Sequence, residues 1–295
     1  MHKQASIGAL IIAVAVSVGC AVHRPPATAG GISAGPDRTR GVRLDGGFAA
    51  TVEAQDPVLS AALQELAITA SADRHCRVAE RYFQLRIFDS AYDHFARARD
   101  LSPSDSAAYL GLARVWREWG FANRGLDDAT RGVHYAPAQP AAHNTLGTIL
   151  LALGRLSDAR LAFERARALD PDAPYPLNNL CYLSFLEGDV AQAMTQCQAA
   201  LDAEPHFIAA RNNLALVYAA SEREDLALRE FSAAGDAAAA SYNIGLVRQA
   251  EGHYAAAAKA FDEASRQRPT WSAARVRAHQ THRLAAAADR ALGTR

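Results

Sequence analysis

The sequence has no excess of charge of either sign. Its 295 residues include 31 Lys and Arg and 31 Asp and Glu, so the formal net charge at pH 7 is zero. Proteins that bind DNA or RNA usually gather positive charge on one surface to offset the phosphates. The charge balance therefore argues against a nucleic-acid partner.

Short motifs of well-known chemistry are also missing. The sequence contains no Walker phosphate-binding loop, no dinucleotide-binding glycine fingerprint, no His-Glu-x-x-His zinc motif and no nucleophile elbow. His279 and His282 lie three residues apart, but no third metal ligand accompanies them, and we interpret both as exposed surface residues. We therefore expect no catalytic residue, no metal site and no cofactor, in a protein that is not an enzyme.

Residues that favour β-strands are few. Aromatic residues make up 7% of the chain, whereas apolar residues make up 50% and alanine dominates them. Alanine is the strongest helix former, and strands prefer aromatic and β-branched residues. A chain of this length fits either two ordinary domains or one elongated repeat array. The composition favours the array, in the all-α class.

The N-terminal residues predict an export signal. Residues 5–19 are almost wholly apolar, follow Lys3 and end before Cys20, which is too short a stretch for a confident membrane span. Residues 17–20 resemble the lipobox of bacterial lipoproteins, although an aliphatic residue is usual at the first position. The resemblance implies a signal peptide over 1–19 and a lipid on Cys20. A plain secretory signal and an uncleaved anchor are the alternatives.

The segment after Cys20 is expected to be a disordered tether over residues 20–47, because it holds three prolines, six glycines and little apolar periodicity. Ala21 replaces the Asp that commonly retains lipoproteins in the inner membrane. The resemblance therefore implies a lipid anchor in the outer membrane, on its periplasmic face. Residues 48–71 contain an amphipathic pattern that predicts an N-terminal capping helix.

Proline recurs with a fixed period through the rest of the chain. Pro103, Pro137, Pro171 and Pro205 lie 34 residues apart, and Pro269 follows after one full period and one shortened by four residues. Internal periods of this length are typical of repeat proteins. The sequence therefore predicts a series of similar structural units.

Aligning the blocks on their prolines brings other residues into register. Counting from the first residue of each block, most blocks have a small residue at position 8, a large one at 11, Gly at 15, Ala at 20, an aromatic residue at 24 and Ala at 27. In the block 140–173 these are Gly147, Leu150, Gly154, Ala159, Phe163 and Ala166. The pattern resembles the tetratricopeptide repeat family. The resemblance implies a solenoid of about six helix-turn-helix repeats over 72–105, 106–139, 140–173, 174–207, 208–237 (shortened) and 238–271, with a C-terminal capping helix over 272–295.

The first helices of such repeats line a concave groove in the family. Asparagine recurs there at positions 5 and 6, as Asn144, Asn178, Asn212, Asn179, Asn213 and Asn243. An amide side chain can donate to and accept from the main chain of an extended peptide. Tyr175 and Tyr182 could add apolar pockets beside the row. The alternative is that the amides only solvate the groove or bond a neighbouring helix.

Two cysteines fall at inward positions of the fourth block, Cys181 at position 8 and Cys197 at position 24. We expect position 8 to face mainly position 20, which would leave position 24 about one turn away. Two buried small apolar residues are therefore the favoured interpretation, and a disulfide is the alternative. Cys76 has no evident partner.

A lipid anchor followed by six repeats is similar to the tetratricopeptide lipoproteins of tight-adherence (Flp) pilus assembly. The resemblance implies a non-catalytic scaffold that binds an extended segment of an envelope protein, in pilus or secretion-system assembly. The alternative is a scaffold or glycan-binding accessory of cell-wall or exopolysaccharide export.

Overall fold

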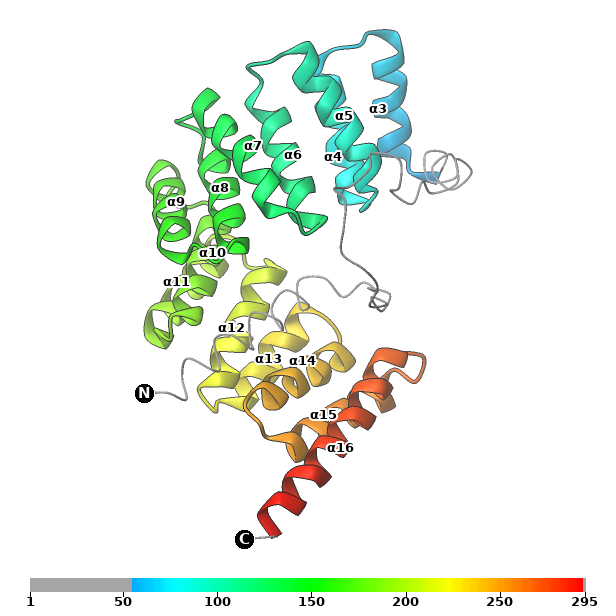
Figure 1. Ribbon diagram of the computed structural model, residues 1–295, viewed down its shortest axis with the longest axis vertical. Helices are drawn as coiled ribbons and strands as arrows, with labels where there is room; N and C mark the ends of the chain where they lie inside the picture. Colours follow the sequence, from blue (N-terminus) through cyan, green and yellow to red (C-terminus); the bar gives the residue numbers. More distant parts are fainter. Residues whose placement is uncertain (1–54, 294–295) are drawn as a thin grey trace, which may run out of the picture. The chain divides into compact units, whose positions relative to one another are not determined.

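A computed structural model describes residues 55–293, with side chains to residue 290. This part of the chain forms fourteen α-helices and contains no strand (Figure 1). The prediction of an all-α fold is confirmed. The expected signal peptide (1–19), the lipidation site Cys20 and the tether (20–47) lie outside the described residues.

The described helices fall into two compact units, residues 55–171 and 172–293. The N-terminal unit consists of α3 (Pro57–Ile68), α4 (Ala72–Gln84), α5 (Phe88–Leu101), α6 (Ser106–Glu118), α7 (Ala122–Tyr135), α8 (Pro140–Ala152) and α9 (Leu156–Leu169). Helices α4 and α5, α6 and α7, and α8 and α9 pack as hairpins, and α3 packs on α4. Each hairpin thus covers an apolar face of its neighbour in this unit.

The C-terminal unit continues the same arrangement. It consists of α10 (Pro174–Leu186), α11 (Val190–Ala203), α12 (Ile208–Ala220), α13 (Glu224–Ala234), α14 (Ala237–Ala250), α15 (Tyr254–Gln267) and α16 (Ser272–Gly293). Three hairpins are formed by successive pairs, and α16 packs on α15 at the end of the unit. Among the described residues, no helix has both the length and the apolar character needed to cross a membrane.

Local sequence explains where the helices begin and turn. The Asp56 carboxylate accepts a hydrogen bond from the Leu59 amide at 2.8 Å, and proline opens α8 and α10. Within four hairpins the turn contains a glycine with φ between 72° and 82°. Two hairpins have a different residue there, Arg86 with φ 61° and Glu222 with φ 60°.

A recurring slot between the two helices of a hairpin forms the core. It lies between the residues at positions 8 and 24, such as Gly147 with Phe163 and Gly245 with Phe261. A Cβ atom added to Gly147 would lie 2.5 Å from Cε1 of Phe163, so the ring occupies the space that glycine leaves. Position 8 therefore faces position 24 directly.

The fourth repeat fills this slot with a disulfide between Cys181 and Cys197, whose Cα atoms are 5.2 Å apart. Both cysteines are fully buried. The favoured expectation of two unbridged thiols therefore differs from the structure. Its geometric premise was wrong, because it placed position 24 a turn away from position 8. Cys76 is free and half-buried.

Candidate partner-binding surface

The predicted asparagine row in the C-terminal unit lies on α10, α12 and α14. A hydrogen bond within the row joins α10 and α12, because Asn213 Nδ2 donates to Asn178 Oδ1 at 2.9 Å. The Asn178 amide nitrogen also lies 3.4 Å from Asn179 Oδ1. Asn178 is only 7% exposed. The bonded pair of Asn178 and Asn213 thus contributes to packing between neighbouring repeats.

Asn212 and Asn243 differ from that pair. Both are half-buried, and within the described residues neither side-chain amide makes a hydrogen bond. Partly buried amides usually find a partner, in the protein or in solvent. These two groups are therefore the members of the row that can bond a ligand without first breaking an internal bond.

The two tyrosines proposed for the groove have different environments. Tyr175 is 58% exposed, and its ring centre lies 4.9 Å from that of Phe207 in an edge-to-face arrangement. Tyr182 is half-buried and packs on the core of the C-terminal unit, and this burial raises its pKa to about 12. Tyr175 therefore offers an accessible apolar surface, whereas Tyr182 is largely a core residue.

Asn144 lies in the N-terminal unit, on α8, where it is half-buried. Two first helices of that unit, α4 and α6, are joined by an ion pair that was not predicted from the sequence. The Arg114 guanidinium bonds both carboxylate oxygens of Glu80 at 2.8 and 3.1 Å and lies 4.1 Å from the centre of the Phe83 ring. Glu80 and Arg114 are 34 residues apart and occupy the same position in consecutive repeats. Opposite charges at equivalent repeat positions are the sequence signal that could have predicted this ion pair.

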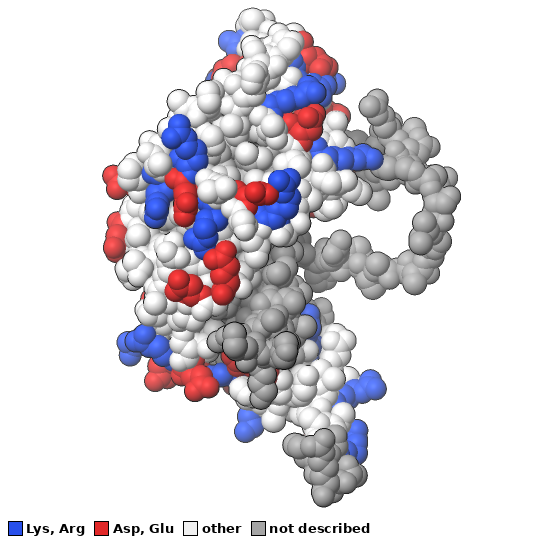
Figure 2. Space-filling view, turned by 60° about the vertical axis from the view of Figure 1, so that its left-hand side comes forward, with Lys and Arg blue, Asp and Glu red and all other residues white. Residues whose placement is uncertain are grey.

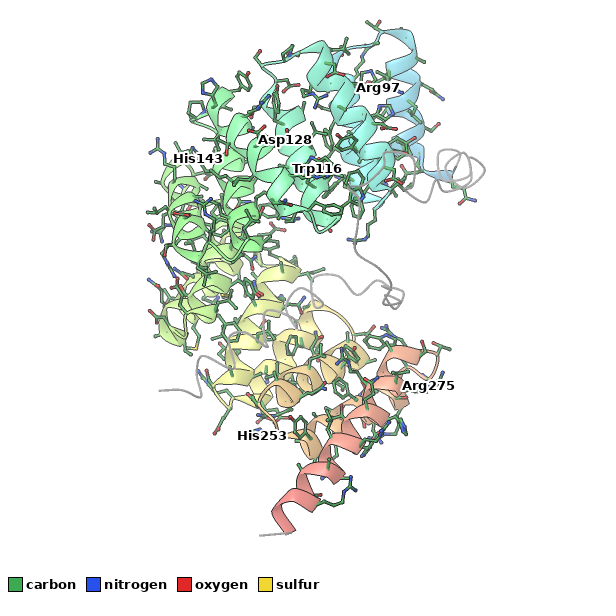
Figure 3. The ribbon with its side chains drawn as sticks, viewed as in Figure 1. Arg97, Trp116, Asp128, His143, His253 and Arg275 are labelled. Carbon is green, nitrogen blue, oxygen red and sulfur yellow. A yellow bond between two sulfur atoms is a disulfide. The ribbon has the colours of Figure 1, made fainter. Side chains whose placement is uncertain are left out.

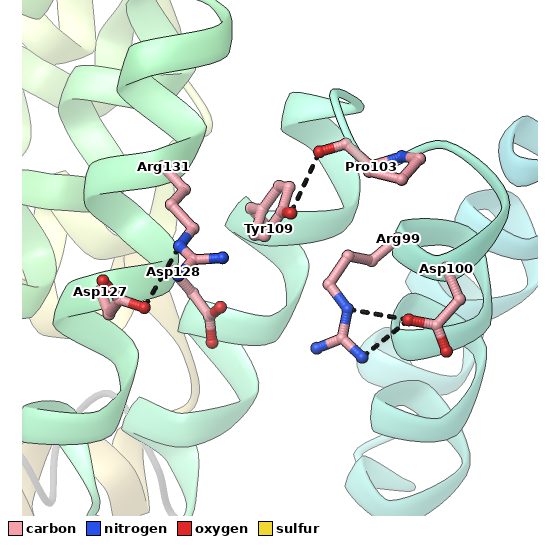
Figure 4. Close-up of a pocket in the computed structure, with 7 residues that line it drawn as sticks. All are labelled: Arg99, Asp100, Pro103, Tyr109, Asp127, Asp128 and Arg131. Carbon is pink, nitrogen blue, oxygen red and sulfur yellow. Dashed lines mark hydrogen bonds and ion pairs between the residues drawn. The ribbon is translucent and has the colours of Figure 1, made fainter.

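A second feature of the N-terminal unit is a pocket of about 460 Å³ among α5, α6 and α7 (Figure 4). It is lined by Arg99, Asp100, Pro103, Tyr109, Asp127, Asp128 and Arg131. Arg99 pairs with Asp100 at 2.9 Å, and Arg131 pairs with Asp127 at 3.2 Å. The pocket was not predicted from the sequence, because most of its lining residues lie outside the first-helix positions that suggested the groove.

The remaining polar groups of this pocket are also paired. The Tyr109 hydroxyl donates to the Pro103 carbonyl at 3.1 Å (Figure 4). The Trp116 indole N–H donates to Asp128 at 3.1 Å; both residues are labelled in Figure 3. Burial raises the pKa of Asp128, and the bond from Trp116 partly offsets that rise. A ligand here would have to compete with internal ion pairs, so we do not regard the pocket as the main binding site.

Aromatic residues gather around Trp116 in the same unit. The rings of Tyr92 and Trp119 each lie 5.3 Å from it, and the Arg124 guanidinium lies 5.2 Å from its centre. Sugars usually stack on an aromatic face that is open to solvent. Neighbouring groups contact the Trp116 indole on several sides, and its N–H already donates a hydrogen bond to Asp128. The cluster therefore gives little support to a glycan-binding site.

Among residues 55–290, His75 of α4 and His94 of α5 form a close pair. Their Nδ1 atoms are 3.0 Å apart. Burial, the adjacent His75 and Arg97 lower the pKa of His94 to about 4. His279 and His282 lie on α16, where His282 bonds Asp262 at 2.8 Å. No group of three or more potential metal ligands occurs in residues 55–293.

Charge is mixed over the surface. On the face drawn in Figure 2, basic and acidic side chains are interspersed and no large patch of one sign is seen. Many of the arginines are paired with a neighbouring carboxylate, as in Arg211 with Glu230 at 2.8 Å and Arg248 with Glu224 at 2.6 Å. Neutral amides and apolar groups are therefore the distinctive features of the C-terminal unit's first helices.

Comparison with known proteins agrees with this architecture. Residues 140–173 match the family model of the tetratricopeptide repeat. The CTR9 homolog of Arabidopsis thaliana is 31% identical over 131 residues, which are 43% of this chain and 12% of that protein. This chain thus spans only a small part of that relative.

Solved structures show the same fold at low sequence identity. The APC/C hetero-tetramer Cut9–Hcn1 gives a TM-score of 0.64 at 19% identity, over 76% of this chain and 45% of that one. PilW, a widely conserved type IV pilus biogenesis factor, gives 0.58 at 18% identity, over 70% and 97% of the two chains. These likenesses show the tetratricopeptide-repeat fold.

Proposed function

We propose that this chain, which has the tetratricopeptide-repeat fold, is a non-catalytic scaffold that holds an extended segment of another protein. The observation that carries the proposal is the row of uncharged amides on α10, α12 and α14, in which Asn212 and Asn243 have no internal hydrogen bond among the described residues. Amides bond the main chain of a peptide whatever its side chains are.

We further propose that the scaffold works in the bacterial envelope, in the assembly of a pilus or a secretion system. The lipobox-like residues before Cys20 support an outer-membrane anchor on the periplasmic side. The likeness of fold to PilW is compatible with a pilus role, although one fold serves many functions. The buried disulfide supports an oxidising compartment.

Membrane anchoring is tested by fractionation. The full-length chain is expected to sediment with the outer membrane and to enter solution only with detergent. Cys20→Ser, which cannot carry the lipid, should leave that fraction. If the variant fractionates with the outer membrane as the parent does, the lipid anchor is refuted, while the scaffold proposal stands.

Partner binding is tested by cross-linking in whole cells, followed by purification and identification of the attached proteins. Repeated recovery of the same pilus or secretion components is expected, with cross-links on α10, α12 or α14. Recovery of enzymes of cell-wall or exopolysaccharide export instead would contradict the pilus role. Cross-links confined to other surfaces would contradict the groove as the contact site.

A further inference from the structure

The boundary between the fifth and sixth repeats differs from the others in this unit. Helix α13 has 11 residues, whereas α11 and α15 each have 14. It ends at Ala234, Gly235 is its C-cap, and α14 begins at Ala237. The fifth repeat has therefore lost about one helical turn at its C-terminal end.

The loss affects the packing of the first helices. Helices α12 and α14 contact one another less extensively than α10 and α12 do. In a stack of hairpins, the second helix of one repeat helps to set the spacing to the next first helix. A shorter α13 therefore gives a more open seam between α12 and α14.

Equivalent amides behave differently at the two seams. Asn178 and Asn213 occupy positions 5 and 6 of consecutive repeats and are bonded at 2.9 Å across the α10–α12 seam. Asn212 and Asn243 occupy the same two positions across the α12–α14 seam. Neither amide has a hydrogen bond within the described residues, although both are half-buried. The open seam thus leaves four amide N–H donors and two carbonyl oxygen acceptors without an internal partner.

The charges beside this seam are already neutralised. Arg211 of α12 bonds Glu230 and the Pro205 carbonyl, and Arg248 of α14 bonds Glu224 and Glu251. A ligand chosen by charge would have to displace these pairs. An uncharged main chain, which offers N–H and C=O groups, matches the free amides without that cost.

Apolar contact is available next to the amides. Tyr242 directly precedes Asn243, is half-buried, and its ring centre lies 4.6 Å from that of Trp271. The two rings fix each other's orientation, and their partly exposed edges leave apolar surface open to solvent. A peptide crossing the seam could therefore place a small apolar side chain against this pair.

We propose that the α12–α14 seam is the binding site for an extended, uncharged peptide segment. Asn212 and Asn243 do not bond each other, and their amides form hydrogen bonds with the main chain of the peptide. The site rests on the proposed scaffold function and locates its contact. Asn178 and Asn213 occupy the equivalent positions at the α10–α12 seam, where they bond each other and do not bind the peptide.

The test uses the purified full-length chain and a display library of random 12-residue peptides. The selected peptides are expected to be low in charge, and their affinities are then measured for matched variants. Asn212→Ala with Asn243→Ala should weaken binding at least about tenfold, since two hydrogen bonds are lost. The control, Asn178→Ala with Asn213→Ala, should bind within about threefold of the parent while unfolding at a lower temperature.

A second variant closes the seam without removing an amide. Inserting a copy of residues 265–268 after Ala234 restores the 34-residue period. Because the two asparagines can then bond each other, peptide affinity should fall at least about tenfold while helicity is retained. Circular dichroism and the unfolding temperature verify that this variant is folded.

The outcomes separate the site from the function. Unchanged affinity in the Asn212 and Asn243 variant, or in a folded insertion variant, would overturn the seam as the site and leave the scaffold in place. Equal loss in both pairs of alanine variants would assign the whole row to packing and overturn the site as well. Failure of the parent to select any peptide would overturn extended-peptide binding itself.

Discussion

Single residues with unusual environments lie outside the regular pattern of the repeats. Glu222 and Arg86 take the left-handed conformation at the turn position where four other repeats have glycine. A side chain in that region costs about 1–2 kcal/mol relative to a right-handed conformation. Each of these two hairpins therefore closes less favourably than its glycine-containing neighbours.

Glu222→Gly should raise the free energy of unfolding by about 1 kcal/mol, because glycine adopts φ 60° without the Cβ clash. Glu222 is exposed, so the loss of its side chain costs little packing. Urea unfolding of the purified protein measures the change. Glu222→Ala is the matched control and should give no gain, since it keeps the Cβ atom. A gain of the same size in both variants would show that side-chain charge, not backbone strain, is responsible.

His94 should make stability depend on pH. Its pKa is lowered from 6.5 to about 4 in the folded protein, so the unfolded chain binds a proton more readily. Its contribution is complete above pH 6.5 and is lost as the pH falls from about 6.5 through about 4. The unfolding midpoint, measured between pH 7 and 4, should decline over that range.

His94→Gln should flatten this part of the pH profile, because glutamine keeps a polar side chain that does not titrate. His143→Gln, at a histidine outside this pair that bonds the main-chain carbonyl of Pro137, is the control for replacing a histidine by glutamine. A parent profile as flat as that of His94→Gln would show that the His75–His94 pair does not oppose protonation.

At the scale of the helical hairpin, the slot between positions 8 and 24 is the main determinant of packing. The sequence predicted which positions are inward but not which of them face each other. Gly125, at position 20, approaches the Ala113 carbonyl, whereas the side chain at 24 fills the space beside position 8. Periodicity identifies an apolar face but contains no information on the rotation of one helix against its partner. For that reason the sequence favoured two unbridged thiols over the Cys181–Cys197 disulfide.

Removing the disulfide should weaken the fourth repeat. Cys181→Ala with Cys197→Ala is expected to lower the free energy of unfolding by about 3 kcal/mol, because the bond closes a loop of 16 residues and fills the slot. Cys181→Gly with Cys197→Phe copies the pairs Gly147–Phe163 and Gly245–Phe261 and should recover a large part of that loss. Denaturant titration of the three proteins makes the comparison. If the glycine–phenylalanine variant is no more stable than the double alanine, the slots are not equivalent.

Over the whole molecule, the repeat pattern, together with the composition, predicted the all-α repeat fold that the structure shows. It did not predict the division into two compact units after Pro171. Pro171 belongs to the same series as Pro137 and Pro205, so nothing in the period distinguishes that boundary. The candidate site was predictable as a row of asparagines, but which amides bond one another depends on helix spacing, which the sequence does not state.

Reduction of the disulfide should affect the two units unequally. In a repeat protein each hairpin is stabilised mainly by its neighbours. Loss of the bond should therefore destabilise the fourth repeat and the repeat packed next to it, but not distant repeats. Hydrogen exchange with and without dithiothreitol is expected to show faster exchange in α10–α13 and no change in α4–α7. Equal acceleration in both units would mean that they unfold as one cooperative body.

The Cys181–Cys197 bond also has a mechanical consequence. Force applied to the two ends of a helical repeat protein unravels its helices into extended polypeptide. The segment from Cys181 to Cys197, with a sequence separation of 16, cannot extend while the bond is intact, which shortens the stretched chain by about 50 Å. Oxidised and reduced molecules would therefore differ in contour length when pulled from their ends, by a step that single-molecule stretching resolves.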